Sequence, residues 1–359
     1  SGSTSNVPPR IDTTSGGAGC GGPALRAIPR AYSPAASGAP RRELCAAALA
    51  CAAWADAIGF DVIGFGEHHL AEDGYNPSPL VLASAMAGRT RRIRLRTAVL
   101  LASCYDPVRL AEDLAVAQLV SDGRIELGLG FGYRPGEFAM YGRKLGDRFD
   151  FTCRIAQFLG QAFSGEAFEW EGRPGRISPL PDKPVPVLLG GMAPKVARAA
   201  ARIADGFLVP LFPADVWQPY RDECLKLGNA DPGLYPQQGP TFLWVSEEPE
   251  RDWEWIAPHV LHVLDSYSRW TSAAYGKPIG PYAGGMTAGT VRQSAAYQVL
   301  TPAQTIELAQ GLGDHSSLYL TPLFGGIEPA RAWKMLRLFE REVYPQLPRG
   351  PVPRWGLRA

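Results

Sequence analysis

The sequence predicts an α/β protein with the (β/α)8 TIM-barrel fold and insertions on its C-terminal face. Strand-like and helix-like segments alternate along most of the 359 residues, and glycine or proline marks many of the junctions between them. Alternation of this kind favours a parallel sheet, and eight strand-like segments favour the closed barrel. A doubly wound open sheet is the structural alternative.

Local signals mark where the segments begin and end. Gly59 follows an Ala- and Leu-rich helix and precedes an apolar strand, which is typical of an α-to-β junction. Ser78-Pro79 and Asp106-Pro107 each combine an N-cap residue with proline at the first helical position. Helices are expected over residues 41–57, 79–88, 107–122, 194–204 and 329–343. Strands are expected over residues 25–28, 60–65, 93–101, 125–129, 185–189, 207–209, 241–245 and 317–320.

Two stretches depart from this alternation of strands and helices. Residues 166–182 are typical of a short hairpin, and residues 247–299 are long, aromatic-rich and irregular after a first helix. Long insertions on a barrel usually cover the active-site face. We therefore expect one barrel domain over residues 23–347 with these two insertions, a flexible N-terminal segment over 1–22 and a C-terminal tail over 348–359.

Composition argues against several classes of function. Lys and Arg number 36 and Asp and Glu 35, a net charge of +1, which leaves no basic footprint for nucleic acid or an anionic membrane. No apolar run reaches the roughly 18 residues of a membrane helix, and residues 1–22 show no signal peptide. The six cysteines include no C-x-x-C pair. This is typical of thiols that stay reduced, so we expect a cytoplasmic protein.

Glu67-His68-His69 comes directly after the strand that ends at Gly66, expected over 61–66. In a parallel barrel this position lies on the C-terminal rim, where catalytic groups gather. Imidazole exchanges protons near neutral pH, so two histidines behind a carboxylate favour an active-site role. The alternative is that one histidine caps the strand and the other only packs.

Two glycine-rich turns are candidate ligand sites. Gly128-Leu129-Gly130-Phe131-Gly132 lets a ligand approach the backbone, but its spacing differs from the dinucleotide fingerprint. Gly190-Gly191-Met192-Ala193-Pro194 opens a helix, and the free N–H groups and dipole of a helix start suit an anion such as phosphate. Arg148 is a candidate counter-charge. Ordinary turns and a solvated arginine are the alternatives.

His259 and His262 are three residues apart on a helical segment, with Tyr267 and Trp270 farther along. This spacing puts both imidazoles on one helix face, as a metal pair requires. No carboxylate stands at a suitable offset, so we favour lid packing or substrate contact for these residues and predict no metal.

Taken together, these motifs resemble the luciferase-like (bacterial luciferase) family of flavin-dependent monooxygenases. The most specific match runs from Ala57-Ile58-Gly59-Phe60-Asp61 to Gly66-Glu67-His68-His69, followed by Ser121-Asp122-Gly123-Arg124-Ile125-Glu126-Leu127-Gly128. Glu137-Phe138, Tyr141-Gly142, Pro322-Leu323-Phe324-Gly325-Gly326 and Phe339-Glu340-Arg341-Glu342-Val343-Tyr344-Pro345 also match. The set is specific, although each motif alone is weak evidence.

The resemblance implies a barrel that holds reduced FMN, or the deazaflavin coenzyme F420 in a sister branch, at its C-terminal mouth. In the family pattern His68 is the catalytic histidine beside the flavin, and a cis peptide bond joins Ala98 to Val99. The chain departs from luciferase at Phe131, which replaces a phosphate-binding arginine, and at Ala193, which replaces a hydroxyl residue. The expected cofactor contacts are Glu67, Ala98, Val99, Gly130, Phe131, Tyr133, Arg148, Gly190, Gly191, Met192 and Ala193.

We therefore predict a two-component monooxygenase that receives reduced FMN from a separate flavin reductase and uses O2 to oxidise a small molecule. The aromatic segment over 244–282 favours a hydrophobic or aromatic substrate, and hydroxylation and oxygen insertion beside a carbonyl both fit. The candidate substrate contacts are His69, His259, His262, Tyr267 and Trp270.

Luciferase-like barrels commonly pair through early helices, so we expect a homodimer. The Ala-rich helix face over 44–57 allows close contact with a second copy, and packing on the barrel is the alternative role of that face.

Three alternative functions stay open. The first keeps the fold and replaces FMN with F420, so that the enzyme moves hydride without oxygen. The second is a metal-dependent hydrolase barrel that uses His68, His69, His259 and His262. The third is a non-catalytic subunit, and the histidine pair at the end of a strand argues against it.

Overall fold

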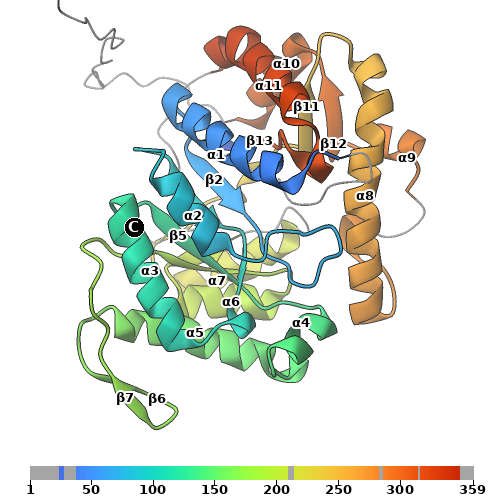
Figure 1. Cartoon of the computed structure of the whole chain (residues 1–359). Coiled ribbons are helices and arrows are strands. Elements are labelled where there is room, and N and C mark those ends of the chain that lie inside the picture. The colour runs from blue at the N-terminus through green and yellow to red at the C-terminus, as the bar shows by residue number, and fades with distance from the viewer. Residues whose placement is uncertain (1–23, 28–37, 209–213, 283–285, 314–315, 348–359) are drawn as a thin grey trace, which may run out of the picture.

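The computed structural model describes residues 24–27, 38–208, 214–282, 286–313 and 316–347. The segment over 1–22 and the tail over 348–359, which we expected to flank the barrel, lie outside the described residues. Within the described part, helices pack around a central set of parallel strands (Figure 1).

The barrel is built on one parallel ladder. In the order of their hydrogen bonding, its strands are β10 (Gln237–Gln238), β13 (Ser316–Leu320), β1 (Ala24–Ala27), β2 (Val62–Phe65), β3 (Arg94–Thr97), β5 (Ile125–Gly130), β8 (Val187–Gly190) and β9 (Gly206–Leu208). Because these strands run in one direction, their carboxyl ends share one rim. The segments after β2, β5 and β8, which carry the histidines and both glycine-rich turns, therefore meet at one mouth.

The helices lie between strands in the chain order, except α11, which follows the last strand, β13. They are α1 (Arg41–Ile58), α2 (Pro79–Ala87), α3 (Pro107–Ser121), α4 (Pro135–Met140), α5 (Arg148–Ala162), α6 (Pro194–Ile203), α7 (Trp217–Lys226), α8 (Pro249–Tyr275), α9 (Ala288–Arg292), α10 (Pro302–Leu312) and α11 (Pro329–Leu338). Proline opens many of them, at a position where its missing N–H has no intrahelical partner to lose. The helix expected over 329–343 is α11 followed by a π-helical turn, Phe339–Val343.

The third predicted strand is divided in two. β3 ends at Thr97, the Ala98–Val99 peptide bond is cis, and β4 (Leu100–Leu101) resumes the pairing with β5. The family resemblance predicted a cis bond at this position, and the prediction is confirmed. Thr97 links β3 to β5. Its hydroxyl donates to the carbonyl of Gly128 at 2.9 Å and accepts the N–H of Gly128 at 2.9 Å.

The seventh unit of the barrel departs from the expectation. The strand expected over 241–245 forms as β11 (Phe242–Val245), but it pairs in parallel with β12 (Tyr297–Leu300) and, within the described ranges, with neither β9 nor β13. β10 and Gly239 continue the ladder of β13 instead. The hydrogen bonding of that ladder ends at the next residue, because Pro240 has no N–H to donate. The expected insertion boundary at residue 299 consequently falls inside a strand.

Both long insertions have regular structure. Residues 166–182 contain the antiparallel hairpin of β6 (Phe168–Trp170) and β7 (Arg173–Gly175), which projects from the barrel (Figure 1). The segment after β11 contains α8, whose 27 residues span about 40 Å. Figure 1 shows α8 running along one side of the molecule toward α4. None of the helices in the described ranges is both long and apolar enough to cross a bilayer.

The Ala-rich face of α1 packs on the barrel. Leu44, Ala48, Ala52 and Ala55 on this face are buried within the single chain. The expectation that this face contacts a second copy is therefore wrong, because the barrel already covers it. Among the neighbouring helices, Val81 of α2 and Val116 and Val120 of α3 are large apolar side chains that stay exposed.

Candidate active site

Glu67, His68 and His69 lie immediately after β2, and all three side chains are buried. The loop that follows folds back on them, because the N–H of His68 donates to the carbonyl of Asn76 at 3.1 Å and the Asn76 side-chain amide donates to the carbonyl of Gly66 at 3.1 Å. A Cβ on Gly66 would lie 2.9 Å from the hydroxyl of Tyr75, so a larger residue there would displace that side chain. The loop thereby fixes the backbone that presents His68.

His68 is held by a carboxylate from the next part of the rim. Its Nδ1 lies 3.1 Å from Oε1 of Glu137 on α4. A carboxylate accepts hydrogen bonds, so Nδ1 carries the proton and Nε2 of the neutral ring is left as an acceptor. The imidazole therefore has a defined tautomer and orientation.

Glu137 gathers several donors at one oxygen. Its Oε1 also accepts the backbone N–H of His69 at 2.9 Å and Nη1 of Arg134 at 3.1 Å, while the same Arg134 nitrogen donates to the carbonyl of His69 at 2.7 Å. Burial works to raise the pKa of Glu137, but the hydrogen bonds from His68 and His69 and the charge of Arg134 outweigh it and lower that pKa below its ordinary value. Glu137 is therefore ionised at neutral pH.

Glu67 forms a second buried network beside the first. Its carboxylate accepts Nε2–H of His69 at 2.7 Å, the N–H of Leu101 at 2.6 Å and the hydroxyl of Tyr105 at 2.9 Å. Burial raises the pKa of Glu67 above its ordinary value in spite of these bonds. The Tyr141 hydroxyl donates to the other nitrogen of His69 at 2.9 Å. His69 is thus held on both sides by protein groups, which favours a supporting role over direct substrate contact.

Aromatic rings surround His68. Its ring centroid lies 4.9 Å from that of Tyr75, 5.8 Å from Tyr133, 5.5 Å from Tyr267 and 4.7 Å from Trp270. Tyr267 and Trp270 belong to α8, so the insertion covers the histidine. Burial lowers the pKa of His68 below its ordinary value, with Glu137 opposing the shift. A neutral imidazole is therefore the resident form.

Small residues form the part of the mouth next to the cis bond. The side chain of Val99 fills the space where a Cβ on Gly130 or Gly190 would stand, at 2.2 Å and 2.8 Å from those positions. Because glycine ends both β5 and β8, the ends of these two strands pack directly against Val99, which follows β3. Phe131, directly after Gly130, stacks on Phe149 with centroids 5.4 Å apart.

The start of α6 lies next to this aromatic pair. Ala193 is the N-cap of α6 and makes no side-chain capping bond. Pro194 has no N–H, and the N–H groups of Val196 and Ala197 donate to the carbonyl of Ala193 at 2.9 Å and 3.3 Å, so in the described structure the first turn leaves the backbone N–H of Lys195 available to an anion. Lys195 in the first turn places Nζ 4.5 Å from the centroid of the Phe149 ring. Arg148 donates to the carbonyl of Leu145 at 2.8 Å, and its charge acts on Tyr275 at the end of α8. Two cations therefore flank this end of the mouth.

The residues fit a bound flavin at two independent places. Oε2 of Glu137 and the hydroxyl of Tyr133 are buried and have no hydrogen-bond partner within the described part of the chain. A ring system with donors and acceptors along its edge would satisfy both atoms. The uncapped start of α6 with Lys195 suits the phosphate of such a ligand.

The two histidines of α8 have separate roles. Nδ1–H of His259 donates to the carbonyl of Gly325 at 2.8 Å, whereas Nε2 of His262 lies 3.1 Å from the carboxylate of Asp73 in the loop after β2. His262 thus helps to join α8 to the His68 loop, while His259 joins it to the segment after β13. In the ranges described above, no group of three or more His, Cys, Asp or Glu side chains is arranged to hold a metal ion.

Several residues of this site were not predicted from the sequence. Glu137 appeared only within a matching motif, and no role was given to Arg134, Tyr75 or Lys195. A signal existed for Lys195, because it directly follows the Gly-Gly-Met-Ala-Pro turn. For Glu137, the only signal was the family pattern, since it lies 69 positions from His68 in the sequence.

A family model described as luciferase-like monooxygenase matches residues 31–267, well over half of the chain. Among curated proteins, the F420-dependent glucose-6-phosphate dehydrogenase of Amycolatopsis mediterranei is 30% identical over 166 residues, which are 43% of this chain and 50% of that protein. The chain spans between a third and a half of the length of such curated relatives.

Solved structures with the same architecture cover nearly the whole chain. A monooxygenase from Streptomyces bottropensis superposes with a TM-score of 0.71 at 21% identity, over 89% of this chain and 98% of that one. The oxygenating constituent of 3,6-diketocamphane monooxygenase from Pseudomonas putida, in complex with FMN, gives 0.63 at 18% identity, over 93% and 100%. At these identities the likeness concerns the fold, and the predicted TIM barrel is confirmed.

The Glu137–His68 pair gives a direct prediction. In Glu137→Gln, the carboxylate that opposes the burial effect is absent, so the pKa of His68 falls further below its ordinary value. NMR titration of the His68 ring measures the change. Glu342→Gln removes an exposed carboxylate and leaves that pKa where it was. An unchanged His68 pKa in Glu137→Gln would show that the carboxylate does not act on the imidazole.

Proposed function

The chain belongs to the luciferase-like monooxygenase family, and we propose that it is a flavin-dependent monooxygenase that oxidises a hydrophobic or aromatic small molecule with reduced FMN and O2. A separate flavin reductase supplies the reduced FMN in this proposal. Family membership supports an oxidoreductase activity, and the choice of FMN, O2 and substrate class is ours.

One observation carries the proposal. His68 has its Nδ1 tied to Glu137 and its ring enclosed by Tyr75, Tyr133, Tyr267 and Trp270, at the carboxyl end of the barrel strands. Such an enclosure excludes water and presents one neutral imidazole to a reacting molecule. A flat apolar ligand matches its aromatic walls better than a sugar or a polyanion.

Reduced FMN, when bound, supplies the reaction with O2, and the protein supplies position and a proton-transfer group. His68 holds a lone pair at Nε2, and Glu137 keeps the opposite nitrogen protonated, so the ring accepts or returns one proton without turning. Arg134 balances the charge of Glu137 and lies with its guanidinium 4.3 Å from the centroid of Trp270. The covering aromatic residue is thereby linked to the carboxylate.

The curated relatives support F420 as the second candidate cofactor, since one of them is an F420-dependent dehydrogenase. Anaerobic titration of the purified chain with reduced FMN and with reduced F420 distinguishes the two. We expect reduced FMN to quench tryptophan fluorescence to saturation at micromolar concentration. Quenching by F420 alone would replace the monooxygenase proposal with hydride transfer by a deazaflavin.

Lys195 is proposed to bind the phosphate of FMN through its ammonium group, together with its own backbone N–H in the first turn of α6. Lys195→Gln should weaken FMN binding about tenfold, the magnitude of one charge-assisted hydrogen bond, and leave riboflavin binding unchanged because riboflavin has no phosphate. Fluorescence titration with both flavins measures the difference. Lys226→Gln, at the end of α7, is the matched control with no effect on either. Equal losses for FMN and riboflavin would contradict a phosphate contact.

His68 is proposed to be the catalytic residue. With reduced FMN and O2 supplied, His68→Ala should lower kcat/KM for an accepted substrate by about 100-fold or more, while the Kd for FMN changes little. His259→Asn, which keeps a donor for the Gly325 carbonyl, serves as the control. Unchanged turnover in His68→Ala would remove the catalytic assignment.

A homodimer stays part of the proposal, on a different surface from the one first expected. Val81, Val116 and Val120 are exposed on α2 and α3, which lie side by side (Figure 1). A second copy that covers these valines would bury apolar surface that the single chain leaves in water. Sedimentation should give a dimer that Val81→Lys dissociates, and a wild-type monomer at micromolar concentration would contradict it.

A further inference from the structure

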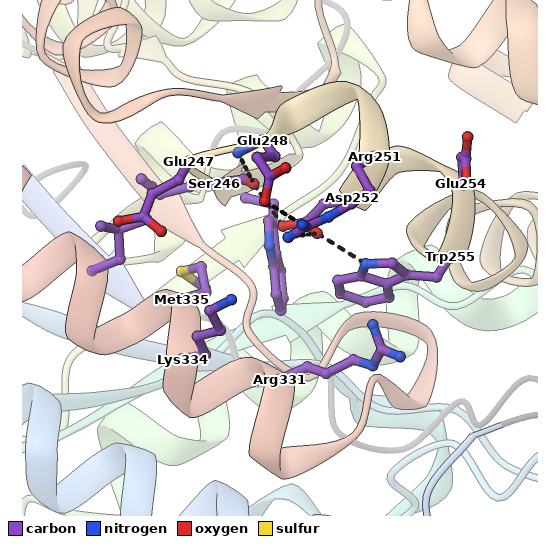
Figure 2. Close-up of a pocket in the computed structure, with 13 residues that line it drawn as sticks. Ser246, Glu247, Glu248, Arg251, Asp252, Glu254, Trp255, Arg331, Lys334 and Met335 are labelled. Atoms are coloured by element: carbon purple, nitrogen blue, oxygen red, sulfur yellow. Dashed lines mark hydrogen bonds and ion pairs between the residues drawn. The ribbon is translucent and has the colours of Figure 1, made fainter.

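The charged side chains around the cavity between the first turns of α8 and α11 leave no excess of positive charge (Figure 2). The lining contains the carboxylates of Glu247, Glu248, Asp252 and Glu254 and the cations of Arg251, Arg331 and Lys334. Glu248 pairs with Arg251 in this set. The cavity therefore has no net attraction for an anion. The interior of the barrel has the opposite balance of charge.

Three charged side chains lie inside the barrel: Arg94 and Arg96 of β3 and Glu126 of β5. Glu126 is the cross-strand partner of Arg96, and Arg94 stands two positions before Arg96, so all three lie on one face of the sheet. Leu95 and Ile125, on the other face, belong to the hydrophobic core that the strands share with the surrounding helices. The face with the charges is therefore the inner one. Barrel interiors are ordinarily filled by branched apolar side chains, so this cluster is a departure.

Glu126 holds both arginines. Its Oε1 accepts Nη1–H of Arg94 at 2.9 Å, and its Oε2 accepts Nε–H of Arg96 at 2.6 Å. Burial works to raise the pKa of Glu126, but the charges and hydrogen bonds of Arg96 and Arg94 outweigh it and lower that pKa below its ordinary value. Glu126 is therefore ionised. Since arginine always carries its charge, the carboxylate neutralises one of the two guanidiniums.

One positive charge is left over in this cluster. The side chains of Arg96 and Glu126 are only 2% and 4% exposed. No acidic residue other than Glu126 occurs in the described strands of the barrel ladder, so these strands supply no second carboxylate. An uncompensated charge in a protein interior is strongly destabilising. A bound counter-ion removes that cost.

Each arginine also has an unused donor. Nη2 of Arg96 and Nη2 of Arg94 are buried and have no hydrogen-bond partner within the described part of the chain, although 22% of the Arg94 side chain is exposed. Buried polar groups without a partner are rare, and a bound ion or water is a common reason for them. Water would satisfy these donors, but only an anion also balances the charge.

We propose that the interior of the barrel holds one small monoanion of the size of chloride, bound by the Nη2 groups of Arg94 and Arg96. A single negative charge brings two cations and one carboxylate to neutrality, and the anion accepts from both free donors. Arg96 precedes Ala98 of the cis bond by two strand positions, about 7 Å, so the ion lies below the mouth of the barrel. Its binding depends neither on flavin nor on His68.

Thermal unfolding of the full chain tests the proposal. We expect Tm to rise by about 2 °C or more as chloride replaces gluconate at constant ionic strength, because an anion that binds only the folded chain stabilises it. Gluconate is the reference because it is much larger than chloride. Arg337→Met removes an exposed cation from the last turn of α11 and should keep the full response to chloride.

Two substitutions in the cluster should have opposite effects. Arg96→Met leaves Arg94 and Glu126 as one balanced pair, so the response to chloride should be lost. Glu126→Gln removes the neutralising carboxylate, so chloride should bind about tenfold more tightly. Circular dichroism in chloride checks that both variants are folded. An equal response in Arg96→Met and the wild type would overturn the proposal.

Diffraction from wild-type crystals grown in bromide locates the ion without any substitution. We expect an anomalous peak within hydrogen-bond distance of Nη2 of both Arg94 and Arg96. Water alone at this position would overturn the proposal. A chloride response that is lost in Lys195→Gln would also overturn it, because the anion would then lie at the proposed position of the flavin phosphate.

Discussion

The Glu137 carboxylate is the constraint on which the mouth of this barrel depends. Removing a carboxylate from water is costly unless donors replace the lost hydration. Here Nδ1–H of His68, the N–H of His69 and Arg134 converge on one of its oxygens. Because one of these donors is a cation, Glu137 stays ionised and can fix the tautomer of His68. The chemistry of the site therefore starts from a group that itself need not touch a substrate.

The insertion that contains α8 supplies the side chains that cover His68. Tyr267 and Trp270 cover His68, and the Tyr267 hydroxyl donates to that of Tyr75 at 3.2 Å. His262 meets Asp73 on the same loop. The loop after β2 and α8 thus form one packed unit, although they lie far apart in the sequence.

Many of the elements and part of the site were predictable from the sequence. Helix starts at proline and strand ends at glycine were local signals, and α1, α2, α3 and α6 formed close to their expected bounds. The pairing of β11 with β12 was missed, because β12 looked like part of an irregular insertion and nothing local shows that Pro240 ends the ladder of β13. At the site, His68 was found by its place after a strand, whereas Glu137 carries no such positional signal. His259 and His262 share a helix face, yet their partners lie on different segments, which spacing alone does not reveal.

By itself, the sequence determined the order of most barrel strands and of the helices that a proline or a cap marks, and it showed which residues follow each predicted strand. These properties depend on neighbours within a few positions, such as caps, prolines and apolar periodicity. Only the tertiary structure decided which carboxylate meets His68, which helix covers it and which cation stands beside Phe149 at the start of α6. These contacts depend on how segments that are distant in the sequence meet around the barrel. Signals from neighbouring residues do not show which distant segments will meet.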